Sequence, residues 1–321
     1  MRKPGRPFTF CAVLLALGAS WTPAVSSQEY PSRPLRIVTA PAGGGNDFSA
    51  RLIARAIAGP LGQQVIVDNR PTVLAPEVVA KAAPDGYTVL LNGSSHWIGP
   101  LVDRVSYDPV RDFAPVSLAD RTPVILVVHP SLPVKSVKQL VALAKARPGE
   151  LNFSSGAPGS SNYLGGMLFN HYAAVNIVRI PYKGAAPAMT AVMSGETQLM
   201  FASPGGSMGH VKSGRLRALA VGSARPSALA PGLPTLAESG APGYVCETLH
   251  AVFAPAGTPA PIVARLHQEI DRFLQSAEGK GQFLKGGVEA VSSTPEELMS
   301  TMKAEVATIG KVLRAAGVTA P

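Results

Sequence analysis

The amino-acid sequence predicts an α/β protein with two lobes, each a sheet rich in parallel strands and covered by helices. Strand-like and helix-like segments alternate along most of the chain, which is typical of parallel strands joined by helices. Two apolar strands each precede a proline-containing turn, as expected where a chain crosses between lobes. The length of 321 residues also exceeds what one ordinary hydrophobic core accommodates.

The N-terminal segment 1–27 has the composition of an export signal. Arg2, Lys3 and Arg6 precede an apolar segment at 8–19, which is too short to span a bilayer. Cys11 lies in this segment without a lipid-attachment pattern, and small residues offer a cleavage site near residue 26 or 27. We therefore expect a periplasmic protein with a cleaved signal peptide. The alternative is a retained N-terminal anchor, and the short apolar segment argues against it.

Runs of β-branched and other apolar residues predict the strands, and apolar residues at helical spacing predict the helices. In the first helix Asn46 or Asp47 is a natural N-cap, and Phe48, Ile53 and Ile57 fall on one face. The expected strands are 35–40, 65–68, 88–92, 124–129, 151–154, 177–180, 198–202, 216–221 and 250–254. The expected helices are 47–58, 137–145, 161–172, 185–194, 259–276 and 295–316.

The two expected crossings divide the chain into a discontinuous lobe and an inserted lobe. They are the strand 124–129 before Pro130 and the strand segment 251–254 before Pro255. The first lobe then comprises 28–129 and 251–321, and the second lobe comprises 130–250. Ligands of such folds bind beyond the carboxyl ends of strands, which here means the cleft between the lobes.

Charge and cysteine content narrow the class of partner. The formal charge of +9 falls by three to +6 when the signal peptide is removed, and the excess is scattered rather than gathered with aromatic residues. This pattern argues against nucleic-acid binding and suits a small anionic ligand. Cys246 alone remains, so no internal disulfide forms and we expect a buried thiol. The histidines show no metal-ligand spacing; we expect a monomer with no metal or cofactor.

The stretch 41–47 carries the clearest binding signal. It reads Pro41-Ala42-Gly43-Gly44-Gly45-Asn46-Asp47, follows a strand and opens a helix. Amides in the first turn of a helix lack partners within it and carry the positive end of its dipole. Glycines let an anion approach these amides closely. No Lys-Ser/Thr pair or GxGxxG spacing follows, so the loop is neither a P-loop nor a dinucleotide fingerprint. The alternative is a plain strand–loop–helix turn.

Residues at the ends of other expected strands are further binding candidates. Hydroxyls and imidazole after the strand 88–92 suit the distal part of a ligand, or else complete a satisfied turn. Lys183 pairs with a carboxylate or is a solvated turn residue. The candidates at these strand ends are Ser94, Ser95, His96, Tyr182, Lys183, Ala202 and Ser203.

Many short motifs, taken together in order, resemble one known family over essentially all of the mature chain. They are Tyr30-Pro31-Ser32-Arg33-Pro34, the 41–47 loop, Val67-Asp68-Asn69-Arg70-Pro71, Ala83-Pro84-Asp85-Gly86-Tyr87-Thr88, Tyr107-Asp108-Pro109, His129-Pro130-Ser131, Pro181-Tyr182-Lys183-Gly184, Gly214-Arg215-Leu216 and Ala254-Pro255-Ala256-Gly257-Thr258-Pro259. The set resembles the Bug family of periplasmic solute receptors, which serve tripartite tricarboxylate transporters.

The resemblance implies a Venus-flytrap receptor of the periplasmic-binding-protein fold. Such receptors bind small carboxylates largely through main-chain amides and waters, and one loop from each lobe acts as a pincer. The implied contacts are Pro41, Ala42, Gly43, Gly44, Asn46 and Asp47 in the first loop, and Ser155, Gly156, Gly159, Ser160 and Ser161 in the second. The implied partners are a small organic acid and membrane transporter subunits. A receptor that signals to a membrane sensor kinase is the alternative.

Three departures from the family pattern bear on the ligand. Thr72-Val73-Leu74-Ala75-Pro76 replaces a glycine-rich loop, Asn162-Tyr163 replaces Ser-His, and Ala202 stands where an aspartate is common. The apolar Val73 and Leu74 favour a ligand with a hydrophobic or aromatic body. The missing aspartate disfavours an amino-acid ligand.

One catalytic pattern occurs, and we expect it to be a chance match. Gly205-Gly206-Ser207-Met208-Gly209 fits GxSxG, and Glu238 or Asp271 with His250 or His267 would complete a serine hydrolase. A nucleophile elbow requires a sharp turn from strand to helix. Pro204 and the full-length resemblance favour a loop here, so we expect no enzymatic activity.

Overall fold

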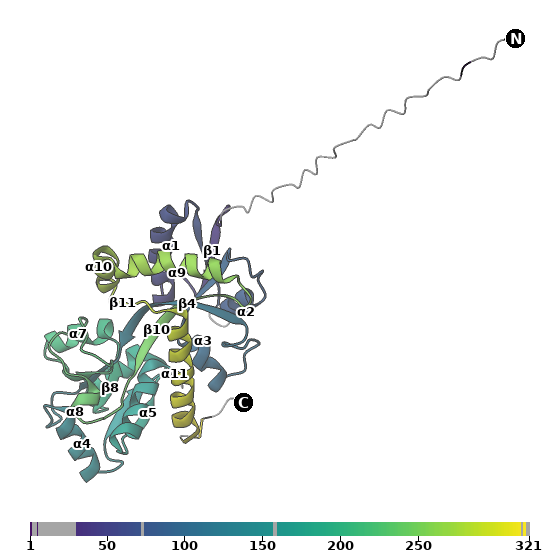
Figure 1. Ribbon diagram of the computed structural model, residues 1–321. Coiled ribbons are helices and arrows are strands. Elements are labelled where there is room, and N and C mark those ends of the chain that lie inside the picture. Colours follow the sequence, from purple (N-terminus) through teal and green to yellow (C-terminus); the bar gives the residue numbers. More distant parts are fainter. Residues whose placement is uncertain (2–4, 6–29, 72–73, 157–158, 316, 319–321) are drawn as a thin grey trace.

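The computed structural model describes residues 1, 5, 30–71, 74–156, 159–315 and 317–318. The expected signal peptide lies almost wholly outside the described residues, as do Thr72 and Val73 of the altered loop. The described chain folds into two α/β lobes, each with its own sheet and surrounding helices (Figure 1). The two-lobed α/β class expected from the sequence is confirmed. In the described part of the chain, no helix combines the length and the apolar character needed to traverse a bilayer.

The first lobe is built on a six-stranded mixed sheet. Its strands are β1 (Leu35–Thr39), β2 (Val65–Asn69), β3 (Thr88–Gly93), β4 (Phe113–Pro123), β10 (Glu247–Pro255) and β11 (Glu289–Ala290). Their order is β11-β4-β10-β3-β1-β2. β1 is parallel to β2 and β3, whereas β10 is antiparallel to β3 and β4.

Amphipathic helices cover this sheet. They are α1 (Gly45–Leu61), α2 (Leu74–Ala80), α3 (Ser95–Ile98), the 3-10 turn η1 (Gly99–Leu101), α9 (Ala260–Gln275) and α10 (Ala277–Lys285). In α9, Leu266, Ile270 and Leu274 are spaced four apart and buried, because this spacing repeats on one helix face. α1 ends at Gly62, whose φ of 64° is the left-handed conformation that suits a glycine C-cap.

The second lobe is built on a five-stranded mixed sheet in the order β7-β6-β8-β5-β9. Its strands are β5 (Ile125–Val128), β6 (Asn152–Ser155), β7 (Val178–Pro181), β8 (Leu199–Ala202) and β9 (Arg217–Val221). Its helices are α4 (Val137–Ala146), α5 (Ser161–Ala173), α6 (Ala185–Met193), α7 (Pro204–Lys212) and α8 (Leu236–Ser239). β6 is parallel to its neighbours, and β5 is antiparallel to β8 and β9.

The chain passes between the two sheets at Val124 and at Cys246. The Val124 amide donates to the Cys246 carbonyl (3.3 Å), the Cys246 amide donates to the Gly222 carbonyl (2.8 Å), and the Gly222 amide donates to the Val124 carbonyl (2.7 Å). The two passages are thus hydrogen-bonded together. They lie a few residues before the expected boundaries, because β5 pairs entirely within the second sheet.

Two local expectations differ from the structure. The sequence predicts no strand at β4, because the apolar residues of this segment are interrupted by Pro115, Asp120 and Arg121. A loop is expected at 204–209, whereas these residues belong to helix α7. Pro204 begins that helix, since a proline is well tolerated in a first turn where its missing N–H has no partner to lose.

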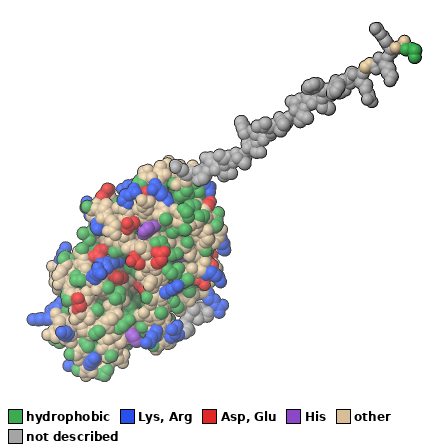
Figure 2. All heavy atoms as spheres, viewed as in Figure 1, with side chains coloured by type: hydrophobic (Ala, Val, Ile, Leu, Met, Phe, Trp, Pro, Cys, Tyr) green, Lys and Arg blue, Asp and Glu red, His purple; other side chains and the backbone are tan. Residues whose placement is uncertain are grey.

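The C-terminal helix α11 (Pro295–Ala315) contacts both lobes. It packs against β4 and α3 of the first lobe and against α5 of the second (Figure 1). On the molecular face drawn in Figure 2, basic and acidic side chains are interspersed rather than gathered into single-sign patches.

Candidate functional site

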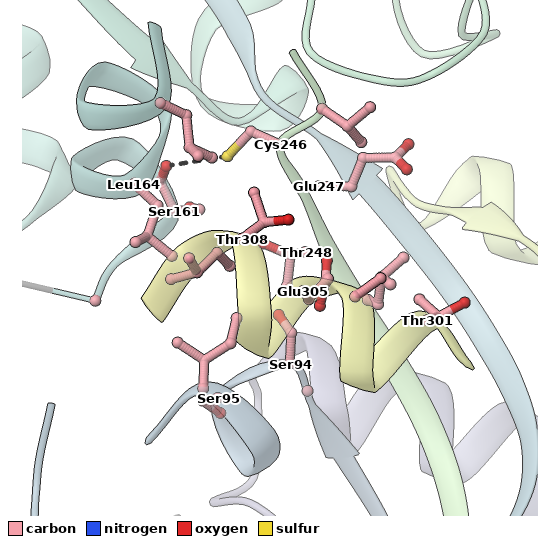
Figure 3. Close-up of a pocket in the computed structure, with 18 of the residues that line it drawn as sticks. Ser94, Ser95, Ser161, Leu164, Cys246, Glu247, Thr248, Thr301, Glu305 and Thr308 are labelled. Carbon is pink, nitrogen blue, oxygen red and sulfur yellow. Dashed lines mark hydrogen bonds between the residues drawn. The ribbon is translucent and has the colours of Figure 1, made fainter. Parts of the chain in front are cut away.

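A cavity of about 540 Å³ lies between the lobes and is lined by both. Its walls come from the start of α1, the β3–α3 turn, one face of α5 along its length, the segment 243–250 and α11. Figure 3 shows Glu305 and Thr308 projecting from α11, with Ser94 and Ser95 on one side and Cys246 and Ser161 on the other. The apolar part of the wall is formed by Ile98, Leu164, Leu168, Val245 and Ile309.

The start of α1 presents unpartnered amides at this cavity. The N-cap Gly44 makes no side-chain capping bond, and the first helical bond runs from the Phe48 amide to the Gly44 carbonyl (3.0 Å). The amides of the preceding residues, including Asn46, therefore have no acceptor within the helix. Asn46 itself lines the cavity.

The side chain of Asp47 stabilises the 41–47 loop through hydrogen bonds and an ion pair. Its carboxylate accepts from the Gly43 amide (3.0 Å) and from Asn69 Nδ2 (2.9 Å), and it forms an ion pair with Arg51 (2.9 Å). Burial raises the pKa of the Asp47 carboxyl, but the hydrogen bonds from Arg51, Gly43 and Asn69 outweigh burial and hold that pKa below its usual value. Asp47 is thus engaged with its own loop.

The second loop is braced by a side chain that sequence analysis did not single out. Arg179 of β7 donates from Nε to Ser155 Oγ (2.8 Å) and from Nη2 to the Gly156 carbonyl (2.7 Å). Its guanidinium also lies 4.8 Å from the centre of the Tyr163 ring. The signal that could have revealed it is a basic residue inside an otherwise apolar strand.

Asn162 provides a second brace for the same loop. Its Oδ1 accepts from the Gly156 amide (3.2 Å) and from Ser160 Oγ (2.6 Å). The departure from the family pattern at Asn162-Tyr163 therefore places an amide and an aromatic ring under the loop. Gly159 and Ser161 of this loop line the cavity, while residues 157–158 lie outside the described part.

A buried histidine lies at the wall near α1. His250 Nδ1 is 2.6 Å from Asp120 Oδ1, and Ser49 Oγ donates to Asp120 Oδ2 (2.5 Å). Burial lowers the pKa of the His250 imidazole, but the charge of Asp120 and its hydrogen bond outweigh burial and hold that pKa above its ordinary value. From the sequence, His250 is a candidate only for a hydrolase site, because its partners are far away in the chain.

Two carboxyl groups crowd the wall formed by α11 and β10. The Trp97 indole donates to Glu305 Oε2 (2.6 Å). Burial, reinforced by Glu247, raises the pKa of Glu305 to about 7 against the opposing Trp97 bond. Burial likewise raises the pKa of Glu247, whose partner Arg121 lies 3.7 Å away and is shared with Glu289 at 2.8 Å. One arginine thus serves two carboxylates.

Of the predicted ligand contacts, the cavity brings together Asn46, Ser94, Ser95, Gly159 and Ser161. The remaining predicted contacts do not line it. In the first loop these are Pro41, Ala42, Gly43, Gly44 and Asp47, and in the second Ser155, Gly156 and Ser160; the others are His96, Tyr182, Lys183, Ala202 and Ser203. Their direct contact with a ligand stays a prediction.

Two of the predicted contacts that do not line the cavity, His96 and Tyr182, interact with other protein side chains instead. His96 is buried among Tyr107, Phe113 and Phe253, and burial lowers its pKa to about 3. Tyr182 donates to Glu196 Oε1 (2.8 Å). His96 is thus a neutral core residue in this arrangement.

The structure also gives the positions of Leu74, from the altered loop, and of Cys246. Leu74 begins α2 and is 44% exposed, and it does not line the cavity. Cys246 is buried as expected, and burial raises the pKa of its thiol to about 12. Cys246 is therefore a protonated thiol in the wall.

The GxSxG residues do not form a nucleophile elbow. Ser207 is fully buried within α7, and its Oγ donates to the Ser203 carbonyl (2.8 Å). An elbow instead exposes its serine at a sharp turn from strand to helix. Ser207 is thus a helix residue bonded to its own backbone.

Two α/β lobes joined by hydrogen-bonded crossings, with a cavity between them, define a protein of the bilobed solute-binding class. The family model described as the tripartite tricarboxylate transporter family receptor matches residues 49–318. The chain therefore belongs to the tripartite tricarboxylate transporter receptor family.

Individual relatives agree with this assignment. Protein BugT of Bordetella pertussis is 37% identical, over 91% of this chain and 92% of the relative. The solved structure of R. palustris Rpa4515 with adipate is 35% identical with a TM-score of 0.72, covering 91% of this chain and all of the other. MatC from Rhodopseudomonas palustris with bound malate is 27% identical with a TM-score of 0.66, over 88% of this chain and 100% of the other.

Proposed function

We propose that this chain is an exported receptor that captures a small organic carboxylate between its lobes for membrane subunits of a tripartite tricarboxylate transporter. The main structural support is that the N-termini of α1 and α5, one from each lobe, lie at the same cavity. Helix N-termini attract anions through free amides and the helix dipole. The family membership supports the transport role.

The composition of the wall supports a ligand with an apolar body. Leucine, isoleucine and valine side chains line the same cavity as the two helix N-termini. A carboxylate whose chain or ring is aliphatic or aromatic fills such a wall better than a densely hydroxylated acid. The neighbours with adipate and malate indicate that linear dicarboxylates belong in the first panel.

We expect the ligand to be captured by closure of the two lobes, because residues of both lobes line the cavity. A ligand that touches the start of α1 and the start of α5 makes contacts with both lobes only when they are together. Such differential contact shifts the equilibrium toward the closed form. The paired passages at Val124 and Cys246 are the expected hinge, and they divide the lobes a few residues before the boundaries 28–129 plus 251–321 and 130–250 that the sequence predicts.

A thermal-shift panel tests the function. The mature protein, unfolded and refolded to remove any co-purified ligand, is heated with adipate, malate, citrate, glutamate, nicotinate or benzoate. Binding to the native state raises the midpoint, with about 2.7 kcal/mol of stabilisation at a ligand concentration of 100 times Kd. We expect a clear shift with an acid that has an apolar body, and a larger one than with citrate. The absence of a shift with every acid contradicts the proposal.

Export, assembly and partner are tested separately. N-terminal sequencing of the periplasmic fraction should find a chain that begins after residue 26 or 27. Light scattering should find a monomer. A pull-down with the ligand present should recover transporter membrane subunits, and recovery of a sensor kinase instead would favour a signalling receptor.

A further inference from the structure

The Ser49–Asp120–His250 chain of hydrogen bonds uses three elements of the first lobe. Ser49 lies on α1, Asp120 on β4 and His250 on β10, where Asp120 and His250 are direct neighbours in the strand pairing. Asp120 is fully buried and the His250 side chain is only 9% exposed. Both oxygens of Asp120 are engaged, one by Ser49 and one by His250. The imidazole orientation is therefore set by a buried carboxylate.

The other ring nitrogen of His250 lies at the start of α1. A Cβ placed on Gly45 would be 3.5 Å from Nε2, and a Cβ placed on Gly93 would also be 3.5 Å from Nε2. The two glycines thus leave the ring edge open. Within the described residues no hydrogen bond is made by Nε2, and Asn46 Oδ1 beside it is buried without a partner.

The protonation of the ring decides what Nε2 does. Asp120 accepts from Nδ1–H, so a neutral imidazole presents a lone pair at Nε2 and an imidazolium presents an N–H. A buried carboxylate without a positive partner is costly, so Asp120 favours the imidazolium. The raised pKa of His250 agrees in direction. In its imidazolium form, His250 therefore presents an N–H donor next to the start of α1.

We propose that His250, charged and oriented by Asp120 and Ser49, donates from Nε2 to the ligand carboxylate held at the start of α1. This assignment rests on the proposed function and names the ionic anchor of its ligand. Binding by an imidazolium also couples to protons: where the free protein is partly neutral, the bound form takes up a proton.

Few charged groups lie around the imidazole ring of His250. Asp120 on β4 is the carboxylate in contact with it, and the carboxylate of Asp47 on α1 is instead bonded to Gly43 and Asn69. The other neighbours, Gly45 and Asn46 on α1 and Gly93 on β3, are uncharged. The remaining titratable side chains that line the cavity are those of Glu305 on α11, Tyr172 on α5, and Cys246 and Glu247 on the β10 side. The two glutamates, when ionised, favour the imidazolium further, and Glu305 titrates in the same range because burial raises its pKa to about 7.

Calorimetry on His250→Gln, Asp120→Asn and the wild type tests the assignment. The probe is adipate, or the acid with the largest thermal shift, between pH 6.5 and 8.5, where the carboxylates of the ligand itself are ionised. Because burial raises the pKa of Glu305 to about 7, inside this window, the same comparison is repeated with Glu305→Gln present in each protein. Two buffers of different ionisation enthalpy measure proton uptake. We expect wild-type affinity to fall as pH rises, with proton uptake on the alkaline side. We expect His250→Gln to bind at least about tenfold more weakly at pH 6.5, the scale of one charge-assisted hydrogen bond, and to lose the proton uptake.

The matched control is His171→Gln, an exposed histidine on α5 outside the cavity, which should behave as wild type. Histidine nitrogen NMR provides a readout independent of affinity: His250 should titrate above its ordinary pKa, and Asp120→Asn should lower that pKa. Unchanged affinity and proton uptake in a folded His250→Gln overturn the assignment while leaving the receptor function intact. If no acid binds the wild type, the receptor function and the assignment fail together.

Discussion

The two loops at the cavity share a local design but are braced by charges of opposite sign. Each follows a strand, contains a left-handed glycine (φ 87° at Gly43 and 83° at Gly159) and opens a helix without a side-chain capping bond. The first is braced by the carboxylate of Asp47, which holds an amide. The second is braced by the guanidinium of Arg179, which holds a hydroxyl and a carbonyl.

This difference shows that a strand–loop–helix pattern does not set the electrostatics of an anion site. The second loop has a cation built into its brace. The first loop has an anion there, and the imidazole of His250 beside it comes from another strand. The two loops are alike in following a strand and opening a helix, and the charged side chain that a third element places next to each loop decides the local charge.

The largest expected effect comes from removing the cationic brace. Arg179→Met leaves the Ser155 hydroxyl and the Gly156 carbonyl without their donors, which should lower the free energy of unfolding by about 2–3 kcal/mol. Carboxylate affinity should fall at least about tenfold, since the loop loses its position and its charge. Urea unfolding and calorimetry measure the two quantities.

Arg33→Met is the control for Arg179→Met, because Arg33 is exposed and pairs with Asp85 far from the cavity. It should change stability by no more than about 1 kcal/mol. If Arg179→Met binds the acid normally, the second loop does not hold the ligand.

Removing the carboxyl group of Glu305 from the wall formed by α11 and β10 should have the next largest effect. Burial raises the pKa of Glu305 to about 7, so the stability that its protonated form provides is complete below its unfolded pKa and is lost as pH rises through about 7. Glu305→Gln should remove this loss and stabilise the protein by roughly 1–3 kcal/mol at pH 8. It should also tighten carboxylate binding at pH 8, because a like charge is removed.

Thermal unfolding of Glu305→Gln and wild type from pH 5 to pH 9 provides the measurement. Glu278→Gln, an exposed acid on α10, is the control and should keep the wild-type pH profile. A Glu305→Gln profile that parallels the wild type would mean that the carboxyl is already ionised at neutral pH.

Backbone strain in the first loop should have a smaller effect on stability and a selective effect on binding. Gly43→Val forces a β-branched residue to φ 87°, at a cost of about 1–2 kcal/mol. Gly214→Val is matched, because Gly214 has φ 74° with no atom within 4 Å, as at Gly43. Both should lose similar stability, and only Gly43→Val should lose carboxylate affinity. Equal affinities in the two variants would exclude the first loop from the site.

The smallest effect is expected for the anionic brace. Asp47→Asn keeps the shape of the side chain and removes the charge that pairs with Arg51, at a cost of about 1 kcal/mol. Because the folded pKa of Asp47 is lowered, its stabilisation is present above the unfolded pKa and is lost as pH falls. Wild type should therefore lose this increment under acid, and Asp47→Asn should not. Glu296→Gln, an exposed acid in the first turn of α11, is the control in urea unfolding.

Local pattern was enough to predict most elements around the cavity. The strands that became β1, β3, β6 and β8 were predicted to within about two residues, as were helices α4, α5 and α11. Their runs and spacings are local properties of the chain. Strand β4 was not predicted because polar residues and prolines interrupt its apolar pattern. Helix α7 was not predicted because its glycines and serines are typical of a loop.

By itself, the sequence determined that the chain has two α/β lobes and glycine-rich loops that open helices, since burial of periodic apolar faces and the steric freedom of glycine are short-range effects. The tertiary structure decided which charges stand at each loop. Asp120 and His250 are 130 positions apart, and Arg179 reaches a loop 23 to 24 positions earlier. Such partners become neighbours only through strand pairing, and their charge states follow from the burial that the fold imposes.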